Sequence, residues 1–86
     1  METNFFDPFY MNTRKLIKLE PNIYHIIGTN NGIDYWQANA KKIKPILILN
    51  SYYNFEFVCD NKKDYCAISK NYIDWPDGNR WYRLRH

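Results

Sequence analysis

The feature that most constrains the fold of this chain is an alternation of apolar and polar side chains in its second half. Every second residue there is apolar, and the apolar positions are Tyr53, Phe55, Phe57 and Cys59. Because successive side chains of a β-strand point to opposite faces of a sheet, this period of two predicts a strand with one buried face.

The same stretch predicts its own hairpin partner. Residues 61–64 are polar and typical of a turn, and residues 65–70 follow them as a second short strand. An antiparallel pair built on this turn places four side chains on one apolar face. The opposed pairs are Cys59 with Cys66 and Phe57 with Ile68.

A second hairpin is predicted around an Asn-Gly pair. Apolar and aromatic residues lie on both sides of residues 29–32, and Asn31-Gly32 suits the centre of a type I′ turn, where both residues need positive φ. In that register Ile27 faces Trp36 and His25 faces Ala38.

Two more segments read as strands. Residues 46–49 form a β-branched apolar run that predicts a buried strand, with Pro45 at its entrance or on an edge because proline cannot donate to a ladder. Residues 81–85 follow the Pro-Asp-Gly turn at residues 76–78 as a last strand.

The N-terminal region allows two interpretations. Asp7 followed by Pro8 has the form of an N-cap and first helical residue, and Pro21 would end a helix near residue 20, with Phe9 and Leu16 on one face. The alternative is an edge strand over residues 14–19. Residues 8–20 are therefore a helix or an edge strand, residues 22–86 are antiparallel β, and residues 1–7 are left as a segment open to disorder.

The length and composition predict one domain over residues 1–86. A chain of 86 residues cannot divide its apolar side chains, 45% of the total, between two cores and stabilise both. The expected fold class is mainly β, or β-rich α+β. We expect a small antiparallel sheet or partly open barrel of five or six strands, with or without one N-terminal helix.

Catalytic and metal-binding patterns are weak. Cys59 and Cys66 lack the paired spacing of a zinc site, and we expect them to be buried thiols rather than a disulfide. Ser51 and Ser69 are not flanked by glycines as in a nucleophile elbow, and His25 on an apolar strand is typical of a core histidine. We therefore expect no enzyme activity, no metal and no cofactor.

Basic and aromatic residues indicate binding instead. The net charge of +3 is mild, but the bases form three clusters: Arg14, Lys15 and Lys18; Lys41, Lys42 and Lys44; Arg80, Arg83 and Arg85. If residues 81–85 form a strand, Trp81, Arg83 and Arg85 share one face and Tyr82, Leu84 and His86 the other.

From this alternation we expect Tyr82 and Leu84 in the core and the first face outside. The predicted partner-binding residues are Trp81, Arg83, Arg85, Trp75, Lys41 and Lys42. In the structural alternative, Trp81 packs into the sheet and the arginines are ordinary solvated edge residues.

Two classes of partner fit these residues. The first is a larger protein, inhibited or adapted through aromatic and arginine contacts, as small accessory proteins of low-GC phages and mobile elements do. The second is nucleic acid, bound by a small β-barrel through stacked aromatics and Lys/Arg clusters. A homodimer through an edge strand is a further alternative.

The predicted location is the cytoplasm of a host cell. The N-terminus carries Glu2 and Asp7 where a secretory signal needs bases. The longest apolar run, residues 46–49, is far shorter than the roughly 20 residues of a membrane-spanning helix.

Overall fold

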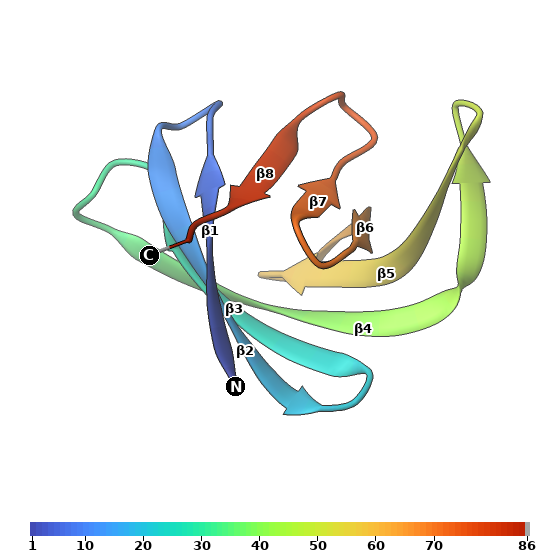
Figure 1. The fold of residues 1–86 in the computed structure, drawn as a ribbon, viewed down its shortest axis with the longest axis horizontal. Helices are drawn as coiled ribbons and strands as arrows, with labels where there is room; N and C mark the ends of the chain where they lie inside the picture. Colours follow the sequence, from blue (N-terminus) through green and yellow to red (C-terminus); the bar gives the residue numbers. More distant parts are fainter. Residues whose placement is uncertain (86) are drawn as a thin grey trace.

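The computed structural model describes residues 1–85 as an all-β domain in which eight antiparallel strands close into a barrel (Figure 1). The strands are β1 (Glu2–Asp7), β2 (Asn12–Glu20), β3 (Ile23–Thr29), β4 (Tyr35–Ile48), β5 (Ser51–Cys59), β6 (Lys62–Ile68), β7 (Tyr72–Asp74) and β8 (Arg80–Arg83). The prediction of a mainly β antiparallel domain is confirmed. The predicted strand count was too low, and the described residues contain no helix and therefore none that could cross a membrane.

Each strand pairs with its neighbour in sequence, and β1 pairs with β8 to close the barrel. The strands therefore run alternately between two ends. Residues 8–11, 30–34, 60–61 and 75–79 connect strands at one end, which we call the mouth end. Residues 21–22 and 69–71 connect strands at the other end.

Of the two interpretations of residues 8–20, the helix is wrong, because residues 2–20 form the β1–β2 hairpin. The alternative of a strand is correct, but β2 pairs with both β1 and β3 and is not an edge. The Asp7 carboxylate accepts a hydrogen bond from the backbone N–H of Phe9 at 2.9 Å, as an N-cap would, but the chain then turns back through Met11 at φ 54°. The inward side chains of β2 include Arg14 and Leu16, both buried. Because the charged residue Arg14 occupies an inward position, the alternation of apolar and polar residues along β2 is interrupted, and the sequence did not clearly predict this strand.

The β3–β4 hairpin is one residue out of the predicted register. Its loop has five residues, 30–34, and the Asn31 side-chain oxygen accepts from the backbone N–H groups of Ile33 and Asp34, both at 2.8 Å. A shift of one residue in register changes which side chains of the two strands share a face of the sheet. The observed opposed pairs are Ile26 with Ala38, Ile27 with Gln37 and Gly28 with Trp36.

The β5–β6 hairpin turns at Asp60 and Asn61, both with positive φ of 49° and 65°. Phe55 therefore faces Cys66, and Cys59 faces Lys62, so the predicted pairs are wrong. The observed register differs from the predicted one by an even number of residues, so the same side chains of the two strands still share the predicted apolar face. Neither cysteine is bonded in the described chain; Cys66 is buried, which raises the pKa of its thiol, and Cys59 is only partly buried.

Residues 46–49 are not the buried strand that we predicted. The β4–β5 register shifts between Lys42 and Ile46, so Pro45 lies within a bulge. Beyond the bulge the two strands leave the barrel as a hairpin (Figure 1). We call residues 45–53 the β4–β5 extension; Leu47 and Leu49 on it are 57% and 81% exposed.

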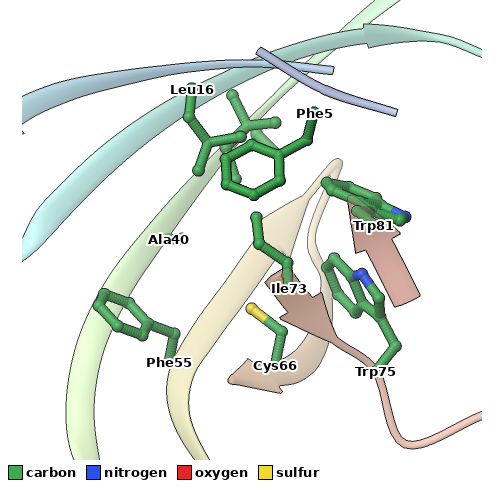
Figure 2. Close-up of a cluster of buried hydrophobic side chains, with 10 residues drawn as sticks. Phe5, Leu16, Ala40, Phe55, Cys66, Ile73, Trp75 and Trp81 are labelled. Carbon is green, nitrogen blue, oxygen red and sulfur yellow. The ribbon is translucent and has the colours of Figure 1, made fainter. Parts of the chain in front are cut away.

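The core fills the barrel with inward side chains from all eight strands (Figure 2). The small residues Ala38 and Ala40 line one wall, and Trp75 and Trp81 lie side by side on the other with ring centroids 4.7 Å apart. Small residues opposite large ones allow so narrow a barrel to be packed. The bulky aromatic side chains are therefore concentrated toward the mouth end.

Candidate functional site: the aromatic mouth

The mouth end contains a hollow of about 630 Å³ between the four loops. Six aromatic side chains line it: Phe9, Tyr10, Trp36, Phe57, Trp75 and Trp81. We call this hollow and its lining the aromatic mouth. All three tryptophans of the chain belong to it.

Four of these rings form a continuous wall. The Trp36 ring lies edge-on to Phe57 with centroids 6.1 Å apart, and Phe57 lies edge-on to Trp75 at 5.0 Å. Trp81 follows beside Trp75. Phe9 and Tyr10 at the opening are 61% and 52% exposed. The site is therefore apolar along its wall and open to solvent at its lip.

Arg14 lies at the base of the mouth and is only 1% exposed. Its guanidinium carbon lies 5.0 Å from the Trp36 ring centroid and 5.4 Å from that of Trp81, within the range of cation–π attraction. Burial lowers the pKa of Arg14, and the charge of Asp7 partly offsets this. Arginine remains charged in proteins, so the mouth contains a fixed cation.

Four N–H groups of Arg14 have partners. Nη2 donates to Asp7 Oδ2 at 2.9 Å and to Asn30 Oδ1 at 2.7 Å. Nη1 donates to the backbone carbonyls of Thr13, at 3.3 Å, and Thr29. These contacts hold β2 against the β3–β4 loop and fix the plane of the guanidinium group.

Asp7 joins the two ends of the described chain. Its Oδ2 binds Arg14, while its Oδ1 accepts from Asn79 Nδ2 and from the Phe9 backbone N–H, each at 2.9 Å. Asn79 belongs to the β7–β8 loop, so this carboxylate links the first hairpin to the last.

Three buried polar atoms of the mouth have no partner among the described residues: Arg14 Nε, Trp75 Nε1 and Asn79 Oδ1. Most buried polar atoms in proteins are hydrogen-bonded, so three in one place need an explanation. The Asn79 amide cannot be flipped without loss, because its Nδ2 must face the acceptor-only carboxylate of Asp7. Side chains that line the mouth thus hold two unpaired donors and one unpaired acceptor, each with almost no accessible surface.

Gly28 allows this geometry. A Cβ at this position would lie 2.5 Å from Trp36 Cζ2 and 2.7 Å from Arg14 Cδ. The Trp36 ring and the Arg14 stem therefore rest directly on the backbone of β3.

The rim of the mouth carries both signs of charge. The residues that line the mouth as a whole include four acids and three bases: Asp7, Asp60, Asp64 and Asp77 against Arg14, Lys62 and Lys63. The mouth therefore has no excess of positive charge.

The predicted faces of the last strand are reversed. Trp81 and Trp75 are 5% and 8% exposed and point into the barrel, whereas Tyr82 and Leu84, predicted as core, are 46% and 37% exposed. Trp81 lies opposite Ile73 in the β7–β8 pair. The alternative interpretation, in which Trp81 packs into the sheet, is therefore the correct one. His86, which we placed with Tyr82, lies outside the described residues.

The other predicted residues lie away from the mouth. Arg83 shares the inward face of Trp81 but at the opposite end, where its Nη1 donates to the Lys70 carbonyl at 3.3 Å, and Arg85 donates to the Asn71 side chain. Lys41 and Lys42 are exposed on β4. The structure brings together only Trp75 and Trp81 of the six.

A second hollow of about 180 Å³ occupies the end opposite the mouth. The charged side chains that line it are Lys18, Lys70 and Arg83, with no acid among the lining residues that the structure describes. We call this region the basic end.

Sequence reasoning missed Asp7, Arg14 and Asn79. The pattern that could have found Arg14 is its place two residues before Leu16, in step with the inward face of β2. The partner of a buried charge is set by the closure of the barrel, which no local pattern shows.

No three His, Cys, Asp or Glu side chains within residues 1–85 form a group that could hold a metal ion. Comparison with protein-family models, curated proteins and solved structures gave no match for this chain.

Proposed function

We propose that this chain is a non-catalytic binding protein that takes a planar ring into the aromatic mouth. The observation that carries the proposal is the wall of four adjoining rings around a hollow of about 630 Å³, with the buried cation of Arg14 at its base. Ligand pockets of this volume, apolar with a few convergent polar groups, are typical of small-molecule sites.

The shape of the lining favours a flat ligand. Trp36 and Phe57 lie edge-on to one another and are only partly buried, so part of their aromatic surface stays free for a bound ring. The side chains of Phe9 and Tyr10 at the lip are exposed and line the hollow, so they are placed to contact a bound ring.

The charges of the mouth disfavour a polyanion. Phosphates at the rim would meet Asp60, Asp64 and Asp77 as well as Lys62 and Lys63. A nucleic-acid strand gains most of its affinity from phosphate neutralisation, which this rim does not supply. We therefore propose a small uncharged ligand for the mouth.

The test uses the three tryptophan indole N–H signals in a proton–nitrogen correlation spectrum, because all three tryptophans line the mouth. Two small planar rings, uracil and 1,3-dimethyluracil, are titrated to high concentration. We expect saturable shifts of these signals with at least one ring. Absence of shifts with both would contradict the proposed function.

Two neighbouring residues of β4 provide a matched pair of variants. Trp36→Leu should weaken binding about tenfold, since a stacked aromatic ring is worth about 1–3 kcal/mol. Tyr35→Leu changes the adjacent side chain, which is 69% exposed and outside the lining, and should leave the affinity unchanged.

A larger protein remains our second candidate partner, now at the β4–β5 extension together with the lysines of β4 that precede it. Residues 41–54 contain Lys41, Lys42 and Lys44 and no acid, and Leu47 and Leu49 are exposed. The described pairings give β4 no β3 partner beyond Lys42, so its outer edge is open. An acidic partner strand fits this edge better than a second copy, whose lysines would add like charge.

Trp81→Ala is unsuitable for testing this partner, because Trp81 is a core residue. Recovery of a protein partner should instead be compared between the wild type, a Leu47→Asn/Leu49→Asn double variant and Trp36→Leu. Loss in the double variant alone supports the extension as the contact surface. Equal recovery by all three would contradict it.

A further inference from the structure

We infer that the ring bound in the aromatic mouth carries a lactam edge, in which a carbonyl oxygen and an N–H lie side by side. The inference rests on the proposed function and adds the ligand's chemical class to it. Its basis is the set of three buried polar atoms without partners: Arg14 Nε, Trp75 Nε1 and Asn79 Oδ1.

The hydrogen-bond inventory of Arg14 is complete except at one atom. A guanidinium group has five N–H donors, and the four on Nη1 and Nη2 are taken by Asp7, Asn30 and two backbone carbonyls. Only Nε–H is free. It is a buried donor that stays unpaired until an acceptor reaches it, which for a ligand requires the side chains that cover it to move aside.

The second donor comes from the aromatic wall. Trp75 is 8% exposed, and its indole N–H, which usually finds a partner when buried, has none among the described residues. In Figure 2 the Trp75 ring lies beside Trp81, whose ring is 5.4 Å from the Arg14 guanidinium carbon. Both free donors therefore belong to side chains that pack against Trp81, and the inference assigns one ligand carbonyl group to the two of them.

The free acceptor belongs to Asn79, which shares the Asp7 carboxylate with Arg14. Asn79 Nδ2 and Arg14 Nη2 bind the two oxygens of the same Asp7 carboxylate, each at 2.9 Å. Asn79 Oδ1 thus faces away from Asp7 and calls for a ligand N–H. A carbonyl oxygen alone leaves this acceptor unpaired, and an amine alone leaves the donors unpaired.

A lactam satisfies both needs within a planar ring. Pyrimidine and purine bases with an exocyclic oxygen have this edge, as do cyclic imides, and their flat faces suit the ring wall. The acidic residues of the rim favour the free base or nucleoside over its phosphate. The competing occupant is ordered water, which can pair with isolated buried polar atoms.

Two ligands of the same shape test the inference on the unchanged protein. Uracil has the lactam edge, and 1,3-dimethyluracil has the same ring with both N–H groups blocked. We expect uracil to bind at least about tenfold more tightly, because leaving a buried acceptor unpaired costs about 1–3 kcal/mol. The readout is the shift of the three indole N–H signals.

The outcomes separate the inference from the proposed function. Equal binding of the two rings would overturn the lactam inference, leave the proposed function in place and assign the polar atoms to water. Binding of neither would overturn both.

A further titration tests the effect of phosphate by comparing the binding of uridine with that of uridine monophosphate and a short oligouridylate. Weaker binding of the two phosphorylated ligands supports a free base or nucleoside. Tighter binding of the oligouridylate would overturn the small-ligand assignment in favour of a nucleic-acid strand.

A variant checks the donor side. Trp75→Phe keeps an aromatic ring and removes the indole N–H, so the affinity for uracil should fall several-fold more than the affinity for toluene, which has no polar edge. Far-ultraviolet circular dichroism establishes that the variant is folded. An equal loss for uracil and toluene would mean that Trp75 acts only through packing, and would overturn its role as a donor.

Discussion

The two ends of the barrel use charged residues in opposite ways. At the mouth end, Arg14 and Asp7 are 1% and 2% exposed and form a fixed hydrogen-bonded pair. At the basic end, Lys18 and Lys70 are exposed around a hollow that no described acid lines. Buried paired charges fix geometry, whereas exposed unpaired charges attract partners over a distance set by salt.

The net charge of +3 is also unevenly distributed between the two ends of the barrel. All six aspartates lie in the mouth half of the chain's strands and loops, as does Glu56, whereas Glu2 and Glu20 lie toward the other end. Most lysines and arginines lie toward the basic end or on residues 41–44 of β4, just before the β4–β5 extension. The small net charge of the chain is therefore the sum of a more acidic mouth half and a more basic opposite half.

The largest expected difference between the ends comes from removing one member of an ion pair. Asp7→Ala leaves Arg14 as an uncompensated buried charge and should lower the free energy of unfolding by about 3–5 kcal/mol. Glu2→Ala removes the exposed partner of Lys15, at 3.5 Å, and should cost less than about 1 kcal/mol. Urea denaturation measures both, and similar losses would contradict the distinction between the ends.

A smaller effect is expected from the close contact on β3. Gly28→Ala places a methyl group against Trp36 and the Arg14 stem and should cost about 1–3 kcal/mol, with a changed near-ultraviolet circular dichroism spectrum. Gly32→Ala is the control, because its φ of +81° strains alanine although open space surrounds it. Its tryptophan spectrum should be that of the wild type. An unchanged spectrum in Gly28→Ala would mean that the mouth tolerates the added methyl group.

The smallest effect on stability is expected at the basic end. Lys18→Gln with Lys70→Gln should change the unfolding free energy by no more than about 0.5 kcal/mol. If nucleic acid binds this end, the double variant should bind a labelled single strand more weakly at low salt, and wild-type binding should fall as salt rises. The matched control is Lys62→Gln with Lys63→Gln at the mouth. No binding by the wild type at low salt would remove nucleic acid as a partner of this end.

The sequence predicted the class of the fold because alternation along a strand is a local property. Phe55, Phe57 and Cys66 were placed on one face correctly even though their pairing was not. Strand β7 was too short, at three residues, for any period to be read. The hydrogen bond from Asp7 to the Phe9 backbone is the same in a helix cap and in a tight turn, so it could not distinguish the two.

The candidate site was less predictable than the fold for a physical reason. Trp75 and Trp81 were predicted to bind a partner on an outer face, whereas both are buried, because the face of β8 that points inward is the one that carries Trp81. The inward position of Arg14 becomes favourable only once Asp7, Asn30 and Thr29 surround it, and these partners come from three separate segments. No single segment of the chain encodes that arrangement.

The pairing of β1 with β8 has a consequence for folding. Every other strand pair joins neighbours in sequence and can form as a local hairpin, which is fast. The contact of Phe6 with Tyr82 must close a loop of almost the whole described chain, which carries the largest entropy cost and should come last. The bond between Asp7 and Asn79 spans the same seam. A chain with an open seam therefore has no mouth, and a ligand held there should slow the opening of the barrel rather than hasten its closure.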